Sequence, residues 1–260
     1  MPELLIRREG PIGTVVFSNP EKYNAMSYDM WRALPPALAE LDADPSIRLV
    51  VLEGAGDKAF VSGADISQFE SSRTDPQAQA RYNASVEAAY QAPVACSKPV
   101  IAKIRGICMG GGLGLAAACD LRICSSDARF RMPAGRLGLG YNLPGVRRFT
   151  TIIGVQNTYD IFFSARIFGA EDALRMGFVT RVTAAGDLDA AVSEWTAMAA
   201  ENAPLTLRAL KRTVNELIKD PDARDQAAVD EAIAACFRSD DYREGARAFM
   251  EKRKPDFKGR

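Results

Sequence analysis

Apolar residues follow two spacings along this chain, and each spacing predicts a different kind of element. Short apolar runs bounded by glycine, proline or polar residues predict buried strands, whereas apolar residues recurring every three or four positions predict helices. Gly10 and Pro11 predict a hairpin turn between the first two strands. The predicted strands are Leu4–Arg8, Gly13–Ser18, Arg48–Glu53, Phe60–Val61, Val100–Ile104, Leu121–Cys124, Arg129–Met132 and Phe178–Val182.

Helical spacing separates these strands and dominates the chain after Pro144. Ser27 is the predicted cap of the first helix, which Pro35 and Pro36 should bend or restart. The strand–strand–helix order from residue 4 to about residue 135 predicts an α/β fold of stacked units wound as a spiral. The further predicted helices are Ala78–Ala92, Leu113–Cys119, Val146–Ile153, Val155–Ser164, Ala170–Met176, Leu188–Ala200, Pro204–Lys219, Ala223–Phe237 and Asp240–Lys252.

The domain organisation follows from the same pattern. We expect a spiral core over residues 1–186 and a C-terminal helical region over residues 187–260, with Gly186 and Asp187 at the boundary. Apolar stripes on the later helices, for example Leu188, Val192 and Trp195, are typical of a core or of a subunit contact.

Composition and charge exclude several classes of function. Of 260 residues, 47% are hydrophobic and 25% are charged, which is ordinary for a globular protein. The 33 basic residues balance the 33 acidic ones, so no overall field favours nucleic acid or a membrane surface. No apolar run approaches the ~20 residues that span a bilayer, and the N-terminal MPELLIRREG lacks the apolar segment of a signal peptide. We expect a cytoplasmic protein with neither a nucleic acid nor a membrane as partner.

The absence of histidine restricts the chemistry further. It excludes Ser-His and Cys-His nucleophile systems and histidine metal sites, so acid–base steps must use carboxylates, tyrosine, lysine, cysteine or water. We expect no metal site. Five cysteines that form no C-x-x-C pair suit buried free thiols in a reducing compartment, and they are Cys96, Cys108, Cys119, Cys124 and Cys236.

One stretch, Lys98–Asp120, combines a predicted strand, a glycine turn and a predicted helix. The strand Val100–Ile104 leads to Gly110–Gly112, and these glycines lead into the helix Leu113–Cys119. Glycines allow a ligand to lie against the backbone, and the first N–H groups of a helix have no partner within it. The stretch therefore predicts a site for an anion, either bound or formed during a reaction.

Two other interpretations of these glycines stay open. Gly112, Gly114 and Ala117 also fit the G-x-G-x-x-A dinucleotide fingerprint, although Arg131 and Met132 stand where its ribose-binding acid is expected. The glycines could also serve only to pack the helix tightly on the strand.

A second N–H donor is available in the segment Ala59–Ile66, AFVSGADI. Asp65 is followed three residues later by Gln68, a capping-box spacing that begins a new helix and favours a cap over a catalytic role for this carboxylate. The N–H of Ala64 precedes that cap, so we expect it to face the glycine turn.

These two segments, together with PEKYNAMS, AACDLRIC, ALRMGFVTRV and EGARAFMEKRKPDF, resemble the enoyl-CoA hydratase/isomerase (crotonase) superfamily along almost the whole chain. The resemblance implies a ClpP-like spiral of ββα units, a C-terminal helical trimerisation region and an acyl-CoA substrate. It implies that the N–H groups of Ala64 and Gly111 bind the thioester oxygen as it becomes an enolate. It also implies a homo-trimer or hexamer, with coenzyme A as part of the substrate and no separate cofactor.

The resemblance also implies contacts with coenzyme A and with the acyl group. Phe69, Tyr82 and Val86 are the candidate residues of the acyl pocket wall, while Lys22 could equally be a solvated surface lysine. The implied coenzyme A contacts within one chain are Lys22, Ala25, Ala64, Asp65 and Ile66, with Phe249 and Lys252 contributed by a neighbouring subunit.

Two departures from the family pattern bear on the reaction. Hydratases of this family hold one water between two glutamates, and the matching positions here are Gly114 and Ala134. Because each missing acid–base group is worth roughly 100- to 10,000-fold, we expect ordinary hydratase activity to be weak or absent.

The loop Leu137–Gly145, LG-x-x-YNL-x-G, resembles that of methylmalonyl-CoA decarboxylase, where the tyrosine lies in the active site; here it is Tyr141. That enzyme has a histidine at the position of Ala64 and a glutamate at the position of Gly114, so the surroundings of the enolate differ. A packing role for Tyr141 stays open. Arg136 is a candidate carboxylate clamp, with a surface or interface arginine as the alternative.

The leading hypothesis is therefore a lyase that decarboxylates a malonyl-type acyl-CoA. The nearest alternative is an enoyl-CoA hydratase or isomerase with a displaced base, for which Glu70 and Glu87 are candidates. A catalytically silent acyl-CoA-binding member and, more remotely, a nicotinamide dehydrogenase are the other hypotheses.

Overall fold

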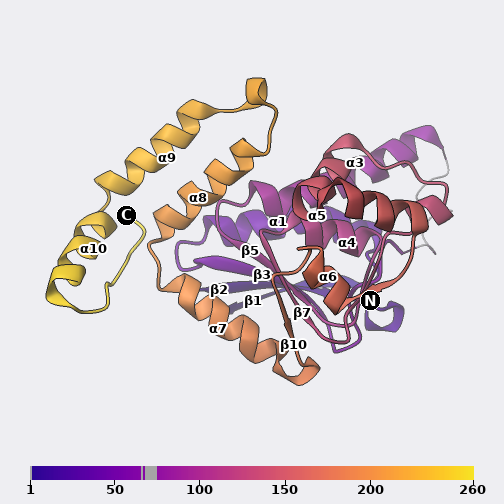
Figure 1. The fold of residues 1–260 in the computed structure, drawn as a ribbon, viewed down its shortest axis with the longest axis horizontal. Coiled ribbons are helices and arrows are strands. Elements are labelled where there is room, and N and C mark those ends of the chain that lie inside the picture. Colours follow the sequence, from indigo (N-terminus) through magenta and orange to yellow (C-terminus); the bar gives the residue numbers. More distant parts are fainter. Residues whose placement is uncertain (1, 66, 68–74) are drawn as a thin grey trace.

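The structure, a computed structural model, describes residues 2–65, 67 and 75–260. Within these residues, strands build two sheets (Figure 1). The larger sheet has the order β1 (Glu3–Glu9), β2 (Ile12–Ser18), β3 (Leu49–Gly54), β5 (Val100–Ile104), β7 (Leu121–Ser125) and β10 (Arg181–Thr183). The smaller sheet has the order β4 (Ala59–Val61), β6 (Ile107–Met109), β8 (Arg129–Arg131) and β9 (Phe168–Gly169).

From β3 to β8, consecutive strands enter different sheets, which produces a spiral. β3, β5 and β7 lie parallel in the large sheet, and β4, β6 and β8 lie parallel in the small one. Each pair is followed by a helix: α3 (Pro76–Ala95), α4 (Gly111–Ala118) or α5 (Leu143–Ser164). The predicted spiral of strand–strand–helix units is confirmed, and the only antiparallel pairs among the named strands of the described chain are β1 with β2 and β8 with β9.

The first helix, α1 (Tyr28–Ala43), begins where the sequence predicts. The Ser27 hydroxyl accepts a hydrogen bond from the Met30 N–H at 3.2 Å, as expected of a cap. The predicted restart at Pro35 and Pro36 is wrong, because the helix continues through both prolines. Buried residues before and after them, such as Leu34 and Leu38, hold the helix against the core.

Other boundaries differ modestly from prediction. α5 contains Gly154 with φ 75°, so it consists of the two predicted helices meeting at a kink. The strand expected at Phe178–Val182 is shorter and later, since Phe178 and Val179 are buried in the core before β10 begins. The short strands β6 and β9 were not predicted, because three or fewer residues carry no readable alternation.

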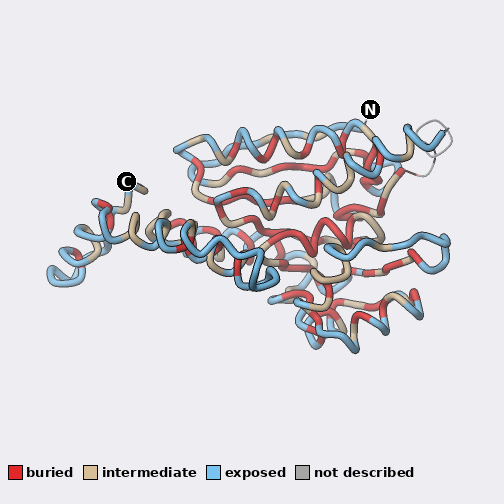
Figure 2. The backbone as a smooth tube through the Cα atoms, turned by 90° about the horizontal axis from the view of Figure 1, so that it is seen from above, coloured by how far each residue is buried: buried red, intermediate tan, exposed pale blue. Residues whose placement is uncertain are grey.

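The core lies between the sheets and the helices α1, α3, α4 and α5 (Figure 2). Its largest fully buried side chains include Trp31, Phe17, Phe60 and Phe130. On the opposite face of the large sheet, α7 (Leu188–Ala200) packs Leu188 and Val192 against Val51 and Ile123. The short helix α6 (Ala170–Arg175) precedes β10.

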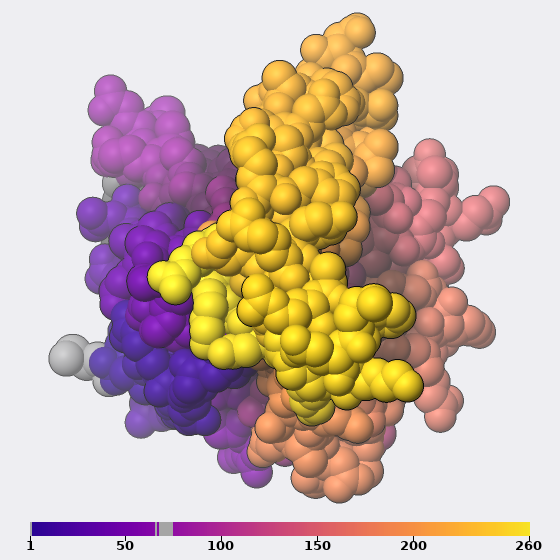
Figure 3. Space-filling model, turned by 90° about the vertical axis from the view of Figure 1, so that its left-hand side faces the viewer, coloured from indigo at the N-terminus to yellow at the C-terminus, as the bar shows by residue number. Residues whose placement is uncertain are grey.

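The last helices extend away from this core (Figures 1 and 3). They are α8 (Pro204–Leu217), α9 (Gln226–Arg238) and α10 (Asp240–Glu251). Many of their large apolar side chains are exposed, among them Leu210, Leu217, Phe237, Phe249 and Met250. No helix in the described part of the chain has the length and apolarity needed to cross a membrane. The division at residues 186 and 187 stays a prediction.

Candidate active site

A cavity of about 540 Å³ lies between α3, the beginning of α4 and the segment that leads into α5. It is mainly apolar, and four of its lining residues carry groups that can exchange a proton: Tyr82, Glu87, Tyr90 and Tyr141. The wall also contains both glycine-rich turns expected to face each other, through Gly63–Ala64 and Gly110–Gly111. Tyr82 and Val86, two of the predicted pocket residues, lie in this wall, whereas the third, Phe69, lies outside the described residues.

The N–H of Ala64 is directed by a bridge to Met26. The Met26 N–H donates to the Gly63 carbonyl at 2.8 Å, and the Asp65 N–H donates to the Met26 carbonyl at 2.9 Å. In a parallel bridge of this kind the middle residue, Ala64, directs its own N–H away from the partner. Ala64 lines the cavity, and its N–H donates to no protein acceptor within the described chain.

The second donor, Gly111, is the first residue of α4, where an N–H has no partner inside the helix. The preceding Gly110 has φ 51°, a left-handed conformation that glycine adopts easily. Gly63 approaches closely, because a Cβ placed on it would lie 3.9 Å from the Gly111 nitrogen. The structure therefore brings the two predicted N–H donors to one side of the same cavity.

Gly112 explains why α4 can approach β4. A Cβ on Gly112 would lie 2.1 Å from the Val61 carbonyl oxygen, which is an impossible contact. The absence of a side chain at this position lets the helix pack on the strand that leads to the other donor, Ala64. Gly112 therefore serves helix packing, as one of the open interpretations suggested. This packing role and the N–H donor site are compatible.

Two phenols occupy the space beside Gly114. A Cβ at this position would lie 2.8 Å from the Tyr141 hydroxyl oxygen and 3.0 Å from that of Tyr90. The two hydroxyls therefore lie close together, and their interaction raises the pKa of Tyr90 and lowers that of Tyr141. Burial raises the pKa of Tyr141 to about 12 and raises that of Tyr90 well above its ordinary value, so both phenols are neutral near pH 7. The position that carries a glutamate in hydratases here adjoins two uncharged hydroxyl groups.

Both rings are fixed by aromatic contacts. Tyr141 lies with its centroid 5.1 Å from Phe162 and 6.3 Å from Phe149, both edge-on. Tyr90 meets Trp31 edge-on at 5.6 Å. Tyr141 therefore packs and also reaches the cavity. Tyr90 was not among the predicted pocket residues, although its spacing of four from Val86 and eight from Tyr82 places all three on one helical face.

Glu87 is the carboxylate of the cavity wall among the described residues. Its oxygens accept from the Asn142 side chain at 2.8 Å and from the Gln91 side chain at 2.8 Å. Ala134, at the second hydratase position, also lines the cavity and offers no acid–base group. Arg136 is exposed and is absent from that wall, and Glu70 lies outside the described residues.

The predicted coenzyme A contacts within one chain gather next to Ala64. Lys22 donates to Asp65 at 2.8 Å and to the Ser67 hydroxyl at 2.7 Å. Burial alone would raise the pKa of Asp65, but the bonds from Lys22 and Ser67 outweigh it and lower that pKa. Asp65 also accepts from the Ser67 N–H at 3.1 Å, which agrees with the predicted capping role.

The remaining predicted contacts are not all brought together. Ala25 is nearly buried, and its carbonyl accepts from the Asn19 side chain at 2.8 Å. Ile66 lies outside the described residues. Phe249 and Lys252 lie at the end of α10, on the other side of the molecule from α3 (Figures 1 and 2).

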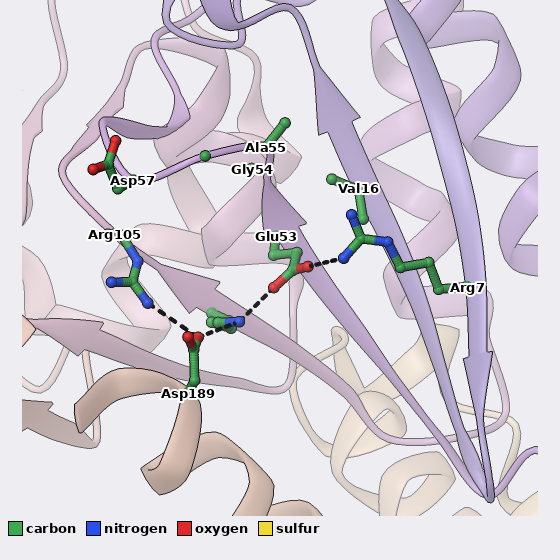
Figure 4. A pocket seen from close by; sticks show the side chains of 10 residues that line it. Arg7, Val16, Glu53, Gly54, Ala55, Asp57, Arg105 and Asp189 are labelled. Carbon is green, nitrogen blue, oxygen red and sulfur yellow. Dashed lines mark hydrogen bonds and ion pairs between the residues drawn. The ribbon is translucent and has the colours of Figure 1, made fainter. Parts of the chain in front are cut away.

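A second hollow, of about 370 Å³, lies on the face of the large sheet that carries α7 (Figure 4). Its walls are charged, and five of the charged side chains form ion pairs with one another. Lys103 bridges Glu53 and Asp189 at 2.6 Å each, while Arg105 reaches Asp189 at 3.0 Å and Arg7 reaches Glu53 at 3.4 Å. No cluster suited to holding a metal ion occurs among residues 2–65, 67 and 75–260.

Comparisons with known proteins address the family. Residues 7–260 match the family profile described as enoyl-CoA hydratase/isomerase. The chain is 31% identical to the short-chain-enoyl-CoA hydratase of Clostridium acetobutylicum, covering 99% of this chain and 98% of that one. It is 32% identical to the peroxisomal Delta(3,5)-Delta(2,4)-dienoyl-CoA isomerase of Arabidopsis thaliana, covering 94% of this chain and 91% of that one.

A solved structure agrees with these sequence matches. An enoyl-CoA hydratase/carnithine racemase from Magnetospirillum magneticum has a TM-score of 0.93 and 35% identity, covering 100% of this chain and 97% of that chain. The predicted crotonase fold is thereby confirmed. The chain belongs to the enoyl-CoA hydratase/isomerase family of enzymes.

Proposed function

We propose that this enzyme decarboxylates a malonyl-type acyl-CoA thioester. The observation that carries the proposal is the pair of neutral phenols beside Gly114, on the same helix turn as the Gly111 N–H. The site thus offers an enolate-binding pair of backbone donors and a proton donor. It lacks the two glutamates with which relatives of the hydratase type activate water.

The reaction follows from these groups. The bond between the α-carbon and the carboxylate breaks, CO₂ leaves, and the electron pair moves onto the thioester oxygen. The N–H groups of Ala64 and Gly111 stabilise this enolate oxygen. Tyr141 then gives its proton to the α-carbon and regains one from water, so the reaction consumes one proton for each CO₂ released.

The state of Tyr141 favours this order of events. A phenol with a pKa of about 12 is protonated near pH 7 and can donate a proton, but it is almost never available as a base. Decarboxylation forms its enolate by losing CO₂ and needs no base. Hydration and isomerisation both need a group that accepts a proton.

Coenzyme A would lie along the loop of Lys22 and Ala25 and the segment of Asp65, which Lys22 joins, with the thioester between the two N–H donors. We propose that a homo-trimer or hexamer completes this site, with Phe249 and Lys252 contributed by a neighbouring subunit. The exposed apolar side chains of α8–α10, with Phe249 83% exposed, support such a contact. Native mass spectrometry gives the oligomeric state, and Lys252→Ala should weaken coenzyme A binding if the contact exists.

A second candidate is hydration or isomerisation with Glu87 as the single base. Glu87 lines the cavity, and its two hydrogen bonds from neutral side chains hold the carboxylate in place. The names of the relatives, hydratases and dienoyl-CoA isomerases, also support this candidate.

Turnover measured by mass spectrometry separates the two candidates. Purified protein is incubated with methylmalonyl-CoA, ethylmalonyl-CoA and crotonyl-CoA, beside Tyr141→Phe and Glu87→Gln variants. Loss of the mass of CO₂, reduced on the order of 100-fold by Tyr141→Phe and little by Glu87→Gln, supports the decarboxylase. Gain of the mass of water on crotonyl-CoA at an enzymatic rate, abolished by Glu87→Gln, would overturn it in favour of the second candidate.

A further inference from the structure

We propose that Tyr90 is a positioning residue for Tyr141: its hydroxyl turns from the Gly111 carbonyl to the Tyr141 oxygen as Tyr141 gives its proton to the enolate carbon. This inference rests on the proposed enolate reaction and adds a residue that the reaction steps above leave out.

The position of the Tyr90 hydroxyl provides two acceptors for its single proton. One is the Gly111 carbonyl oxygen at 3.4 Å, a long hydrogen bond. The other is the Tyr141 hydroxyl, which lies beside the Tyr90 hydroxyl at the bare α-carbon of Gly114. Because the hydrogen bond to the Gly111 carbonyl is weak, moving the Tyr90 hydroxyl proton from that carbonyl to the Tyr141 oxygen costs little free energy.

The change of hydrogen-bond acceptor by Tyr90 matters because Tyr141 becomes a buried negative charge when it donates its proton. When the Tyr141 O–H bond breaks, the proton forms a C–H bond with the electron pair of the enolate, and Tyr141 becomes a phenolate. A hydrogen bond to a charged group is stronger than one to a neutral group. The Tyr90 hydroxyl therefore stabilises Tyr141 more after proton transfer than before, which accelerates the step.

Among the groups around the Tyr141 hydroxyl, Tyr90 is the one placed to stabilise the phenolate directly. Burial is the main cause that disfavours the Tyr141 phenolate, and Glu87 adds to it, whereas Arg148 acts in the opposite direction. Arg148 forms no hydrogen bond or ion pair with the described residues and acts on Tyr141 only through its charge. The hydroxyl of Tyr90 is thus the direct donor to the oxygen that becomes charged.

The geometry also requires Tyr90 to stay in place. Its ring edge meets Trp31, which is fully buried, and its hydroxyl fills space that a side chain at Gly114 would take. A phenylalanine at position 90 keeps these ring contacts and removes only the hydroxyl. Tyr90→Phe is therefore a specific test of the hydrogen bond.

The first measurement tests the hydrogen bond from Tyr90 to Tyr141 and does not depend on enzymatic turnover. 3-Fluorotyrosine is placed at position 141, and its ¹⁹F signal is titrated in the otherwise native protein and in Tyr90→Phe. We expect the fluorophenol pKa to be about 1 to 2 higher in Tyr90→Phe, because the donor to the phenolate is lost. Tyr159→Phe is the matched control, since that exposed tyrosine stacks on Phe163 and is absent from the cavity wall.

The second measurement follows decarboxylation. Tyr90→Phe should lower kcat on the order of 10- to 100-fold with little change in KM, and should have no further effect in a Tyr141→Phe background. A purely structural role would slow both backgrounds equally. An unchanged fluorophenol pKa, or an equal loss in the Tyr141→Phe background, would overturn the proposal.

The two measurements also separate this inference from the proposed function. If no malonyl-type thioester loses CO₂ while the fluorophenol pKa rises in Tyr90→Phe, the decarboxylase fails and the support of Tyr141 by Tyr90 stands. Should Tyr90→Phe not fold, 3-fluorotyrosine at position 90, titrated with and without the Tyr141 hydroxyl, reads the same hydrogen bond.

Discussion

One hollow lies beside α7 and the other lies between α3, α4 and the segment before α5, and their walls differ in chemistry. Beside α7, ion pairs join Lys103 and Arg105 to Asp189, and Lys103 and Arg7 to Glu53 (Figure 4). The other cavity holds two backbone N–H groups without a protein acceptor in the described chain, beside two neutral phenols.

This difference in wall chemistry indicates which of the two hollows is suited to catalysis. Paired charges hold each other and gain little from a ligand, so the α7 hollow serves to attach a helix. Unpaired donors that face a mainly apolar space cost stability unless something binds to them, which is typical of a functional site. Substitutions in the two hollows should therefore have separate consequences, on turnover in one and on stability in the other.

The largest effect is expected from removing an N–H donor of the cavity. Ala64→Pro lacks the backbone N–H and should lower kcat on the order of 100- to 1000-fold. Ala64→Gly keeps the N–H and serves as the control, with an expected loss below about tenfold. Equal losses in the two variants, measured with the same thioester at matched thermal stability, would mean that the side chain matters and the donor does not.

The next largest effect is expected at the contact between α4 and β4, which brings the segments of the two N–H donors together. Gly112→Ala forces a Cβ against the Val61 carbonyl at 2.1 Å and should lower the free energy of unfolding by about 3 kcal/mol, with loss of turnover. Gly186→Ala is the control, because a Cβ there meets nothing within 4 Å. Urea denaturation of both variants measures the difference, and a stable Gly112→Ala protein would contradict the close approach of α4 to β4.

A smaller and more selective effect is expected at Gly114. A Cβ there separates the two phenols but adds helix propensity worth up to about 1 kcal/mol. Gly114→Ala should therefore lower turnover roughly tenfold while the unfolding free energy changes by less than about 1 kcal/mol. If turnover is unchanged, the phenol pair has no part in the reaction.

The smallest effect is expected in the α7 hollow. Hydrogen bonding from Lys103 lowers the pKa of Asp189, so its carboxylate stabilises the folded state above the ordinary carboxyl pKa near 4, and this contribution disappears as the pH falls through the lowered value. Because the Asp189 side chain is 67% exposed, Asp189→Asn should cost at most about 1 kcal/mol.

Turnover should stay unchanged in Asp189→Asn. The stability difference between the two proteins should shrink between pH 6 and pH 3 in thermal or urea denaturation. A variant that lost activity instead would show that the two hollows are coupled, and the distinction between them would fail.

The sequence by itself determined the order of elements and the backbone part of the site. Apolar runs and helical spacing located most strands and helices, and the glycines at 110–112 with AFVSGADI, through the family resemblance, pointed to Ala64 and Gly111 as the expected N–H donors. These features are local, because chain conformation and the absence of a side chain depend on neighbouring residues alone. The absence of glutamates at positions 114 and 134 could also be read from the sequence, because residue identity at a position is local information.

Tertiary structure alone decided what fills the space that those glutamates leave. Tyr90 and Tyr141 are 51 positions apart in the sequence, on α3 and just before α5, and no spacing rule relates them. They meet only because α3 and α5 both pack beside α4, where Gly114 leaves room for two hydroxyls. The sequence did not reveal the ion pairs of the α7 hollow either, because they join segments that are far apart in the chain, from β1 to α7. Contacts between distant segments depend on packing, which a single sequence pattern does not encode locally.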